Sequence, residues 1–217
     1  VPLGHLGRLL GSGTPTVRLG LLLGFHRLGR RLAGFDSEPL ALVIRDINKF
    51  SNNLMARQLL LTLGARSANP ATPQAGAEAI AKWLAARNLS MPELIIENGS
   101  GLSRRERISA ESLARLLRDA YRHPLSAEFM SSLPLAGIDG TMKSRLLNTS
   151  AASYARVKTG ALENVRSMAG YITDRSQSVW IVIAMVNDPL AENAIPVFDA
   201  LLLALREQGA MTPAQHN

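Results

Sequence analysis

Two short polar stretches carry residue types suited to chemistry. Residues 51–53 read Ser-Asn-Asn, a Ser-x-Asn triplet, and residues 158–160 read Lys-Thr-Gly. The ammonium of Lys158 and the hydroxyl of Thr159 are together suited to bind a carboxylate, because both donate hydrogen bonds and one is charged. Gly160 has no side chain, so a peptide can lie against the backbone there. Each triplet also has a plain structural interpretation, since Ser and Asn are preferred helix N-caps and Lys-Thr-Gly fits a solvated strand end.

The elements around the triplets place them on different kinds of structure. Apolar residues at helical spacing predict helices over residues 37–50, 52–66, 69–88, 109–123, 123–133 and 193–209. β-Branched and aromatic runs predict strands over residues 154–160, 166–174 and 177–186, and a short strand within 92–101 that leads into a glycine turn. Ser-x-Asn therefore lies between two helices, and Lys-Thr-Gly ends a strand that precedes an antiparallel hairpin. The order is a helical block, three antiparallel strands and a covering helix, which is an α+β fold.

Four longer stretches that contain or flank these triplets resemble one enzyme family. They read DINKFSNNLMARQLLLTLG, ENGSGLSR, LPLAGIDGTMKSR and VKTGALENVRSMAGYI, in that order along the chain. Over roughly residues 37–208 the chain resembles the class C low-molecular-mass penicillin-binding proteins, the D-Ala-D-Ala carboxypeptidase/endopeptidase family of the penicillin-recognising acyl-serine enzymes. The resemblance implies a penicillin-recognising acyl-serine transferase (β-lactamase/DD-peptidase-like) fold, with a helical block against an antiparallel sheet and the catalytic cleft between them.

The resemblance also implies roles for the matched residues. Ser51 is expected in the proton relay to the leaving amine, and Asn53 is expected to orient the substrate amide and the catalytic lysine. The backbone N–H of Ala161 is expected to be one of two oxyanion donors. Asp139 and Arg145 are expected to form a buried structural pair. The expected catalytic residues are thus Ser51, Asn53 and Lys158, and the expected substrate-binding residues are Lys158, Thr159, Gly160 and Ala161.

One motif of the family does not occur in this sequence. The nucleophile of these enzymes is the serine of Ser-x-x-Lys, and no serine among the 217 residues is followed by lysine three positions later. The chain is therefore expected to be the C-terminal part of a longer catalytic domain, incomplete at its N-terminus. Alone it is expected neither to hydrolyse peptidoglycan peptides nor to react with penicillin, whereas its parent would do both in the periplasm. The expected partners are stem peptides ending in D-Ala-D-Ala and, for the parent, β-lactams; no cofactor and no metal is expected.

The net charge of +7 comes mainly from one segment. Residues 1–35 hold five arginines and no acid, whereas residues 36–217 hold 19 basic and 17 acidic groups. The balanced body argues against a nucleic-acid partner, since no basic stripe with interleaved aromatics occurs there. Residues 1–35 are also rich in leucine and glycine, which predicts an anomalous segment that is disordered or non-native, such as a frame-shifted read of GC-rich DNA. At most, this segment supports peripheral membrane association.

Other functions remain open at this point. A β-lactamase of the same superfamily would share Lys-Thr-Gly, although the flanking motifs favour the peptidase. A chain that lost its nucleophile by descent would be a non-catalytic module of the same fold that binds peptidoglycan peptides. The sequence separates neither carboxypeptidase from endopeptidase action nor one stem-peptide specificity from another, and it leaves the oligomeric state open.

Overall fold

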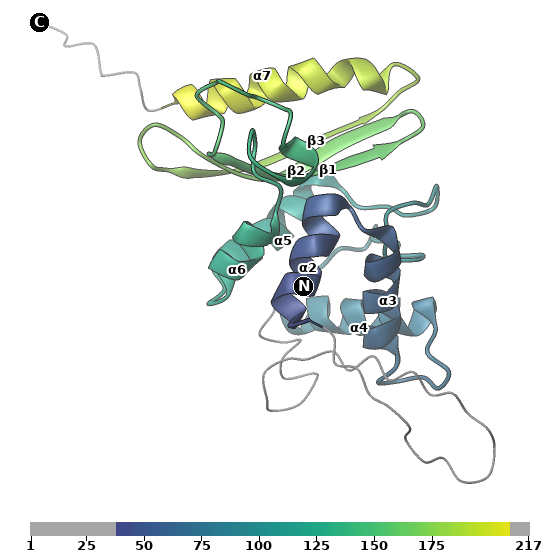
Figure 1. The fold of residues 1–217 in the computed structure, drawn as a ribbon. Coiled ribbons are helices and arrows are strands. Elements are labelled where there is room, and N and C mark those ends of the chain that lie inside the picture. Colours follow the sequence, from purple (N-terminus) through teal and green to yellow (C-terminus); the bar gives the residue numbers. More distant parts are fainter. Residues whose placement is uncertain (1–37, 209–217) are drawn as a thin grey trace, which may run out of the picture.

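The computed structural model describes residues 38–208, which form a helical block and a three-stranded sheet (Figure 1). The Leu/Arg/Gly-rich segment 1–35 lies outside the described residues. Figure 1 shows α7 on one face of the sheet and the other α-helices on the opposite side. This is the α+β arrangement predicted from the sequence, with element ends shifted by a few residues. The elements are α2 Leu40–Phe50, α3 Asn53–Gly64, α4 Pro73–Ala86, α5 Ala110–Tyr121, α6 Ser126–Ser132, the 3-10 helix η1 Gly140–Met142, β1 Ala155–Leu162, β2 Val165–Thr173, β3 Val179–Asn187, the 3-10 helix η2 Ala191–Asn193 and α7 Ala194–Glu207.

The helices of the block begin at capping side chains or are held by packing. The side chains of Asn52, Thr72 and Ser109 cap α3, α4 and α5, each accepting a hydrogen bond of 3.0–3.1 Å from the backbone N–H three residues later. No side chain caps α2, but Leu40 is fully buried and Ile44 nearly so, in a cluster with side chains of α3 and α4. This packing fixes the turn between α2 and α3, which carries the Ser-x-Asn triplet.

The sheet has the order β1-β2-β3, and each neighbouring pair is antiparallel. The register places Lys158 opposite Ala169, and Ala169 opposite Ile183. Side chains alternate between the two faces along each strand, so these three residues share one face. Ala169 and Ile183 pack in a cluster with side chains of α5 and α6, which identifies this face as the one that meets the helical block.

The two faces of the sheet bury different side chains. On one face, α7 places Phe198 and Leu202 in the main core with residues of all three strands. On the other face, Tyr171 is buried beneath α5 and its hydroxyl donates a hydrogen bond of 2.6 Å to the Leu117 carbonyl oxygen. Burial raises the pKa of Tyr171, so the group stays a neutral donor. The helical block is thereby attached to the sheet face that carries Lys158.

The strand predicted within residues 92–101 does not form, which corrects the sequence interpretation. Only Ile95 pairs, in an isolated bridge with Arg107, because a strand requires a longer partner beside it. The backbone N–H groups of residues 97–99 instead donate to the carboxylate of Glu106 and hold a compact loop. This loop forms one wall of the cleft described next. Among residues 38–208, no helix combines the length and apolarity needed to cross a bilayer.

Candidate active site

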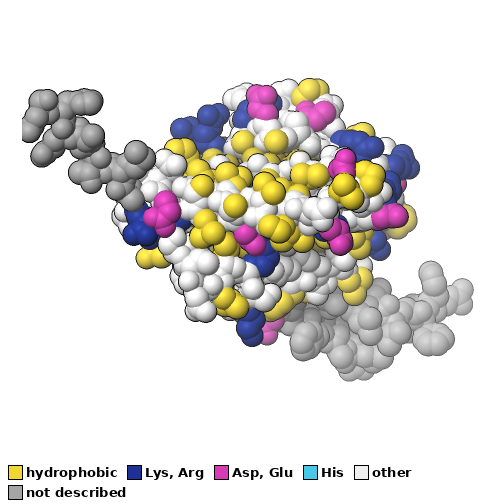
Figure 2. Space-filling view, turned by 90° about the horizontal axis from the view of Figure 1, so that it is seen from above, with side chains coloured by type: hydrophobic (Ala, Val, Ile, Leu, Met, Phe, Trp, Pro, Cys, Tyr) yellow, Lys and Arg dark blue, Asp and Glu magenta, His cyan; other side chains and the backbone are white. Residues whose placement is uncertain are grey.

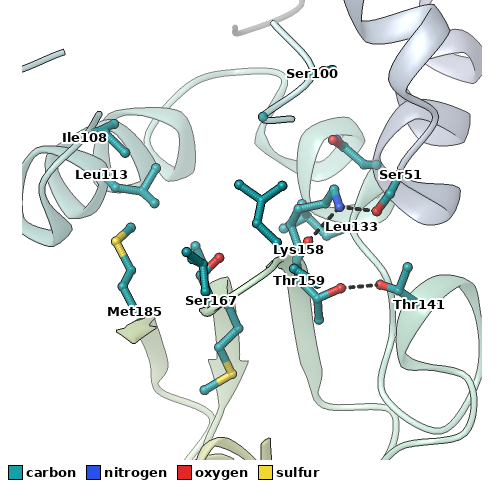
Figure 3. Close-up of a pocket in the computed structure, with 18 of the residues that line it drawn as sticks. Ser51, Ser100, Ile108, Leu113, Leu133, Thr141, Lys158, Thr159, Ser167 and Met185 are labelled. Carbon is teal, nitrogen blue, oxygen red and sulfur yellow. Dashed lines mark hydrogen bonds between the residues drawn. The ribbon is translucent and has the colours of Figure 1, made fainter. Parts of the chain in front are cut away.

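A cleft of about 710 Å³ lies between the helical block and the sheet. Ser51 lines it from the turn between α2 and α3, Asn53 from the first position of α3, and residues 158–161 from β1. Residues 100–102 of the adjacent loop and apolar side chains of α5 and the sheet form the other walls. Figure 3 shows the Ser51 hydroxyl and the Lys158 ammonium turned toward one another. The structure therefore brings together every site residue predicted from the two triplets.

Ser51 follows α2 in a left-handed backbone conformation, with φ 51° and ψ 47°. This conformation is uncommon for residues other than glycine and asparagine, and here the two flanking helices impose it. Asn52 caps α3 through its bond to the Met55 N–H, so the capping interpretation of the triplet holds for Asn52 alone. Asn53 lines the cleft, and its side chain has no hydrogen-bond partner among residues 38–208. The turn thus leaves the hydroxyl of Ser51 and the amide of Asn53 available to the cleft.

Lys158 projects from β1 toward this turn. Its Nζ donates hydrogen bonds to Ser51 Oγ and, at 2.9 Å, to the carbonyl oxygen of Thr159. The contact with Ser51 joins positions 107 residues apart, so it depends on the packing of the helical block against the sheet. Burial lowers the pKa of Lys158 from the ordinary lysine value, because the charged ammonium loses hydration there. An ammonium with a lowered pKa beside a hydroxyl can pass a proton through that hydroxyl.

The outer edge of β1 is covered only at its beginning within the described residues. There, the Val157 N–H donates to the Pro134 carbonyl oxygen at 3.0 Å. Backbone groups alternate between the two edges of a strand, so the N–H and C=O groups of Thr159 and Ala161 point to this same edge, where both residues line the cleft. An extended peptide can therefore pair with this edge, and the Ala161 N–H faces such a peptide. Gly160 lies between them and adds no side chain to the cleft.

An ion pair that the sequence did not indicate fixes the serine turn. The side chain of Lys49 is 8 % exposed, and its Nζ donates to both carboxylate oxygens of Asp139, at 2.8 and 2.6 Å. The same Nζ also donates to the Leu133 carbonyl oxygen at 2.7 Å. Lys49 lies two positions before Ser51, and the segment that carries Leu133 and Asp139 pairs with the beginning of β1. The ion pair therefore ties the serine turn to the strand of Lys-Thr-Gly.

The expected pair of Asp139 with Arg145 is wrong. Asp139 pairs with Lys49, and Arg145 pairs with Asp199 of α7 at 2.7 Å. Met142 is fully buried between the two positions. The side chain of Asp139 lies toward α2 and that of Arg145 lies toward α7. A lysine in the last turn of a helix ordinarily faces solvent and complements the helix dipole, so the position of Lys49 carried no signal of its burial.

The arrangement combines three chemical capabilities in one cleft. The ammonium of Lys158 and the hydroxyl of Thr159 can bind a carboxylate, the edge of β1 can hold an extended peptide, and Ser51 can relay a proton. Within the described residues, no three His, Cys, Asp or Glu side chains are grouped so as to hold a metal ion.

Known proteins of similar sequence are named as carboxypeptidases. Residues 25–203 match the D-Ala-D-Ala carboxypeptidase 3 (S13) family. A D-alanyl-D-alanine carboxypeptidase of Actinomadura sp. (strain R39) is 29 % identical over 182 residues, which cover 81 % of this chain and 34 % of the relative. Carboxypeptidase DacB of Mycolicibacterium smegmatis is 29 % identical over 189 residues, which cover 84 % of this chain and 41 % of the relative. This chain thus spans well under half the length of these curated relatives.

Solved structures show the same fold. Penicillin binding protein 4 of Haemophilus influenzae, in complex with a β-lactam, matches with a TM-score of 0.73 at 24 % identity, covering 84 % of this chain and 46 % of that chain. A predatory endopeptidase of Bdellovibrio bacteriovorus, in complex with an immunity protein, matches with a TM-score of 0.61 at 21 % identity, covering 80 % and 45 %. These likenesses confirm the predicted DD-peptidase-like architecture. Together with the family match over most of its length, they establish that the chain belongs to the D-Ala-D-Ala carboxypeptidase 3 (S13) family, as its motifs predicted.

Proposed function

We propose that this chain is the part of a serine-type D-Ala-D-Ala carboxypeptidase or endopeptidase that binds the carboxyl end of a peptidoglycan stem peptide and relays a proton to the leaving amine. The observation that supports the proposal most strongly is the hydrogen bond between the Lys158 ammonium and the Ser51 hydroxyl, in a cleft beside the free edge of β1. The family and the names of its members support the same reaction. We place the whole enzyme in the periplasm, where its substrate lies.

Each group at the cleft has a task in this proposal. The stem peptide pairs with the edge of β1 at Thr159 and Ala161, and its terminal carboxylate meets the Lys158 ammonium and the Thr159 hydroxyl. The Ala161 N–H donates to the oxygen of the scissile carbonyl, where negative charge develops during acyl transfer. Ser51 passes a proton toward the leaving amine, and the amide of Asn53 orients the substrate. Lys158 supports both tasks, because it contacts Ser51 and stands next to Thr159.

We further propose that the chain by itself forms no acyl-enzyme. Covalent catalysis requires an activated nucleophile, and none of the 217 residues belongs to a Ser-x-x-Lys motif. β-Lactams therefore acylate only a whole enzyme of this family, not this chain. The same observation favours the alternative of a non-catalytic module that binds stem peptides. The two proposals differ in whether the protein in its native length reacts with penicillin.

Ligand binding to the folded chain tests whether the cleft binds the carboxyl end of a stem peptide. Titration of ¹⁵N-labelled protein with N-acetyl-D-Ala-D-Ala is expected to shift the amide signals of residues 51–53 and 158–161 in a saturable way. Lys158→Ala is expected to abolish these shifts, because the carboxylate loses its cation. Lys82→Ala, on the exposed side of α4, is the matched control and should titrate like the wild type. Equal titration of the Lys158 variant, or shifts confined to other residues, contradicts the proposal.

Intact mass after incubation with benzylpenicillin tests whether the chain by itself forms an acyl-enzyme. We expect the mass of the folded chain to remain unchanged. A stoichiometric adduct would reveal a nucleophile within these residues, with Ser51 as the first candidate, and would overturn the assignment of this chain as a part without its nucleophile.

A further inference from the structure

A second threonine lies beside the predicted carboxylate site. Thr141 belongs to η1, and its Oγ1 is 2.9 Å from Oγ1 of Thr159 in β1. Both residues line the cleft, and the side chain of Thr141 is exposed to it. Figure 3 shows the two hydroxyls turned toward each other, next to Lys158. Thr141 lies outside both sequence triplets.

The hydrogen-bonding capacity of the two hydroxyls exceeds what they use on each other. Each hydroxyl has one hydrogen to donate, and a bond between them consumes only one of the two. A carboxylate carries two oxygens that accept several hydrogen bonds and have nothing to donate. When a carboxylate arrives, the threonine pair can exchange its mutual bond for one donated bond from each hydroxyl. Two neutral donors beside an ammonium match a carboxylate better than one, since bonds to an ionised acceptor are the stronger kind.

The position of Thr141 is fixed by contacts on both sides. Gly140 has φ 57°, and a Cβ there would lie 2.6 Å from the Lys49 carbonyl oxygen, so η1 rests directly against the last turn of α2. Met142 on the other side is fully buried in the main core. The hydroxyl of Thr141 is therefore held beside Thr159 before any ligand binds, and little ordering cost remains to be met on binding.

We propose that Thr141 is a second hydroxyl donor for the terminal carboxylate of the ligand, acting together with Thr159 and Lys158. This inference rests on the function proposed above and adds a specificity-determining residue to it. The pair of threonines selects ligands that end in a free carboxylate, because a neutral end group cannot use both donors at full strength.

Comparison of two ligands separates this role from a structural one. N-Acetyl-D-Ala-D-Ala carries the carboxylate, whereas N-acetyl-D-alanine ethylamide lacks it and has the same preceding residue. Dissociation constants are measured by NMR titration of the full chain, with amide spectra of each variant confirming that it is folded. Thr141→Val is expected to weaken binding of the acid about tenfold, the lower end for a hydrogen bond to a charged group, since the site is exposed. The same variant should leave affinity for the ethylamide unchanged.

Three further variants complete the test. Thr141→Ser keeps the hydroxyl and is expected to restore affinity for the acid. Thr159→Val should weaken acid binding as Thr141→Val does. Thr62→Val is the matched control, because the Thr62 hydroxyl is exposed and bonds only within α3, and it should bind both ligands like the wild type.

The outcomes distinguish the failure of this inference from that of the function beneath it. The inference is overturned if Thr141→Val retains acid affinity while Thr159→Val loses it, and the proposed function then stands. Equal loss for both ligands, without rescue by serine, would show a structural role for Thr141 instead. A wild-type chain that binds the ethylamide as well as the acid would overturn the carboxylate site itself.

Discussion

Replacing either partner of the Lys49–Asp139 ion pair should lower the free energy of unfolding, and the two single substitutions should lower it by different amounts. The side chain of Lys49 is 8 % exposed and that of Asp139 is 40 % exposed. Asp139→Asn leaves a buried ammonium without its counterion, a change that costs roughly 3–5 kcal/mol in buried pairs. The remaining bond to the Leu133 carbonyl oxygen and the neutral amide place the expected loss near the lower end, at about 3 kcal/mol. Lys49→Met removes the buried charge, keeps most of the volume and leaves a carboxylate that water reaches, so we expect about 1 kcal/mol.

Urea unfolding followed by far-UV circular dichroism measures both free energies. The amide signals of Ser51 and its neighbours should shift in both variants, because the ion pair fixes the turn that carries them. Asp119→Asn is the control, since it breaks the half-buried Arg87–Asp119 pair elsewhere in the helical block and should leave the Ser51 signals in place. Equal losses for the two test variants, or a larger loss for Lys49→Met, would refute the expectation that the buried Lys49 ammonium needs its counterion more than the exposed Asp139 carboxylate does.

Three further expectations concern single residues of the site and its supports. Affinity for N-acetyl-D-Ala-D-Ala should fall as pH rises through the lowered pKa of Lys158, because the neutral amine no longer attracts a carboxylate. The free energy of unfolding should rise with pH between that lowered pKa and the ordinary pKa of lysine. In this window the unfolded chain binds a proton that the folded chain has lost. NMR titrations and urea unfolding across pH check both signs, and Lys158→Met should remove both trends. Gly160→Ala would place a Cβ 2.4 Å from Ser167 Oγ, so it should lower the free energy of unfolding by about 1 kcal/mol in thermal unfolding. Adding Ser167→Ala should recover most of this loss. A double variant no more stable than Gly160→Ala would contradict the clash. Asn52→Ala should lose about 1 kcal/mol with the cap of α3, whereas Asn52→Asp should unfold like the wild type.

The parts of the fold that the sequence predicted are those that local physics determines. The capping side chain of Ser109 and the apolar spacing of α2 are visible in the sequence, and both helices form close to the predicted residues. The hairpin of β2 and β3 likewise follows from apolar runs around a polar turn. The placement of Ser-x-Asn between helices and of Lys-Thr-Gly on a strand followed from these elements, whereas their meeting across a cleft was expected only from the resemblance to the penicillin-binding proteins.

The parts that escaped prediction depend on contacts between distant residues. No feature of the neighbouring sequence indicates that Lys49 is buried, because its burial depends on the ion pair with Asp139. Likewise, no neighbouring residue indicates that Arg145 pairs with Asp199 of α7. The strand expected near Ile95 reduced to a single bridge, because strand formation is decided by what lies beside a segment. Thr141 gained its place at the cleft only through the fold of η1 against α2. Sequence patterns predicted residues that the structure places around one cleft, and the tertiary structure showed which contacts hold them there.

The outer surface of α7 carries exposed apolar side chains. Figure 2 views the molecule from the side of α7 and shows hydrophobic side chains along this helix, with charged side chains of both signs around them. The exposed apolar residues of α7 include Val197 and Leu201. These positions lie on the side of the sheet opposite the cleft, so we expect substitutions there to leave carboxylate binding unchanged.

A crystal structure of the chain with N-acetyl-D-Ala-D-Ala would show whether the cleft binds the carboxyl end of a stem peptide. We expect the ligand to pair with the edge of β1 and its terminal carboxylate to lie within hydrogen-bond distance of the Lys158 ammonium and the Thr159 hydroxyl. A ligand bound elsewhere, or bound in this cleft with its carboxylate turned away from Lys158, would contradict this expectation.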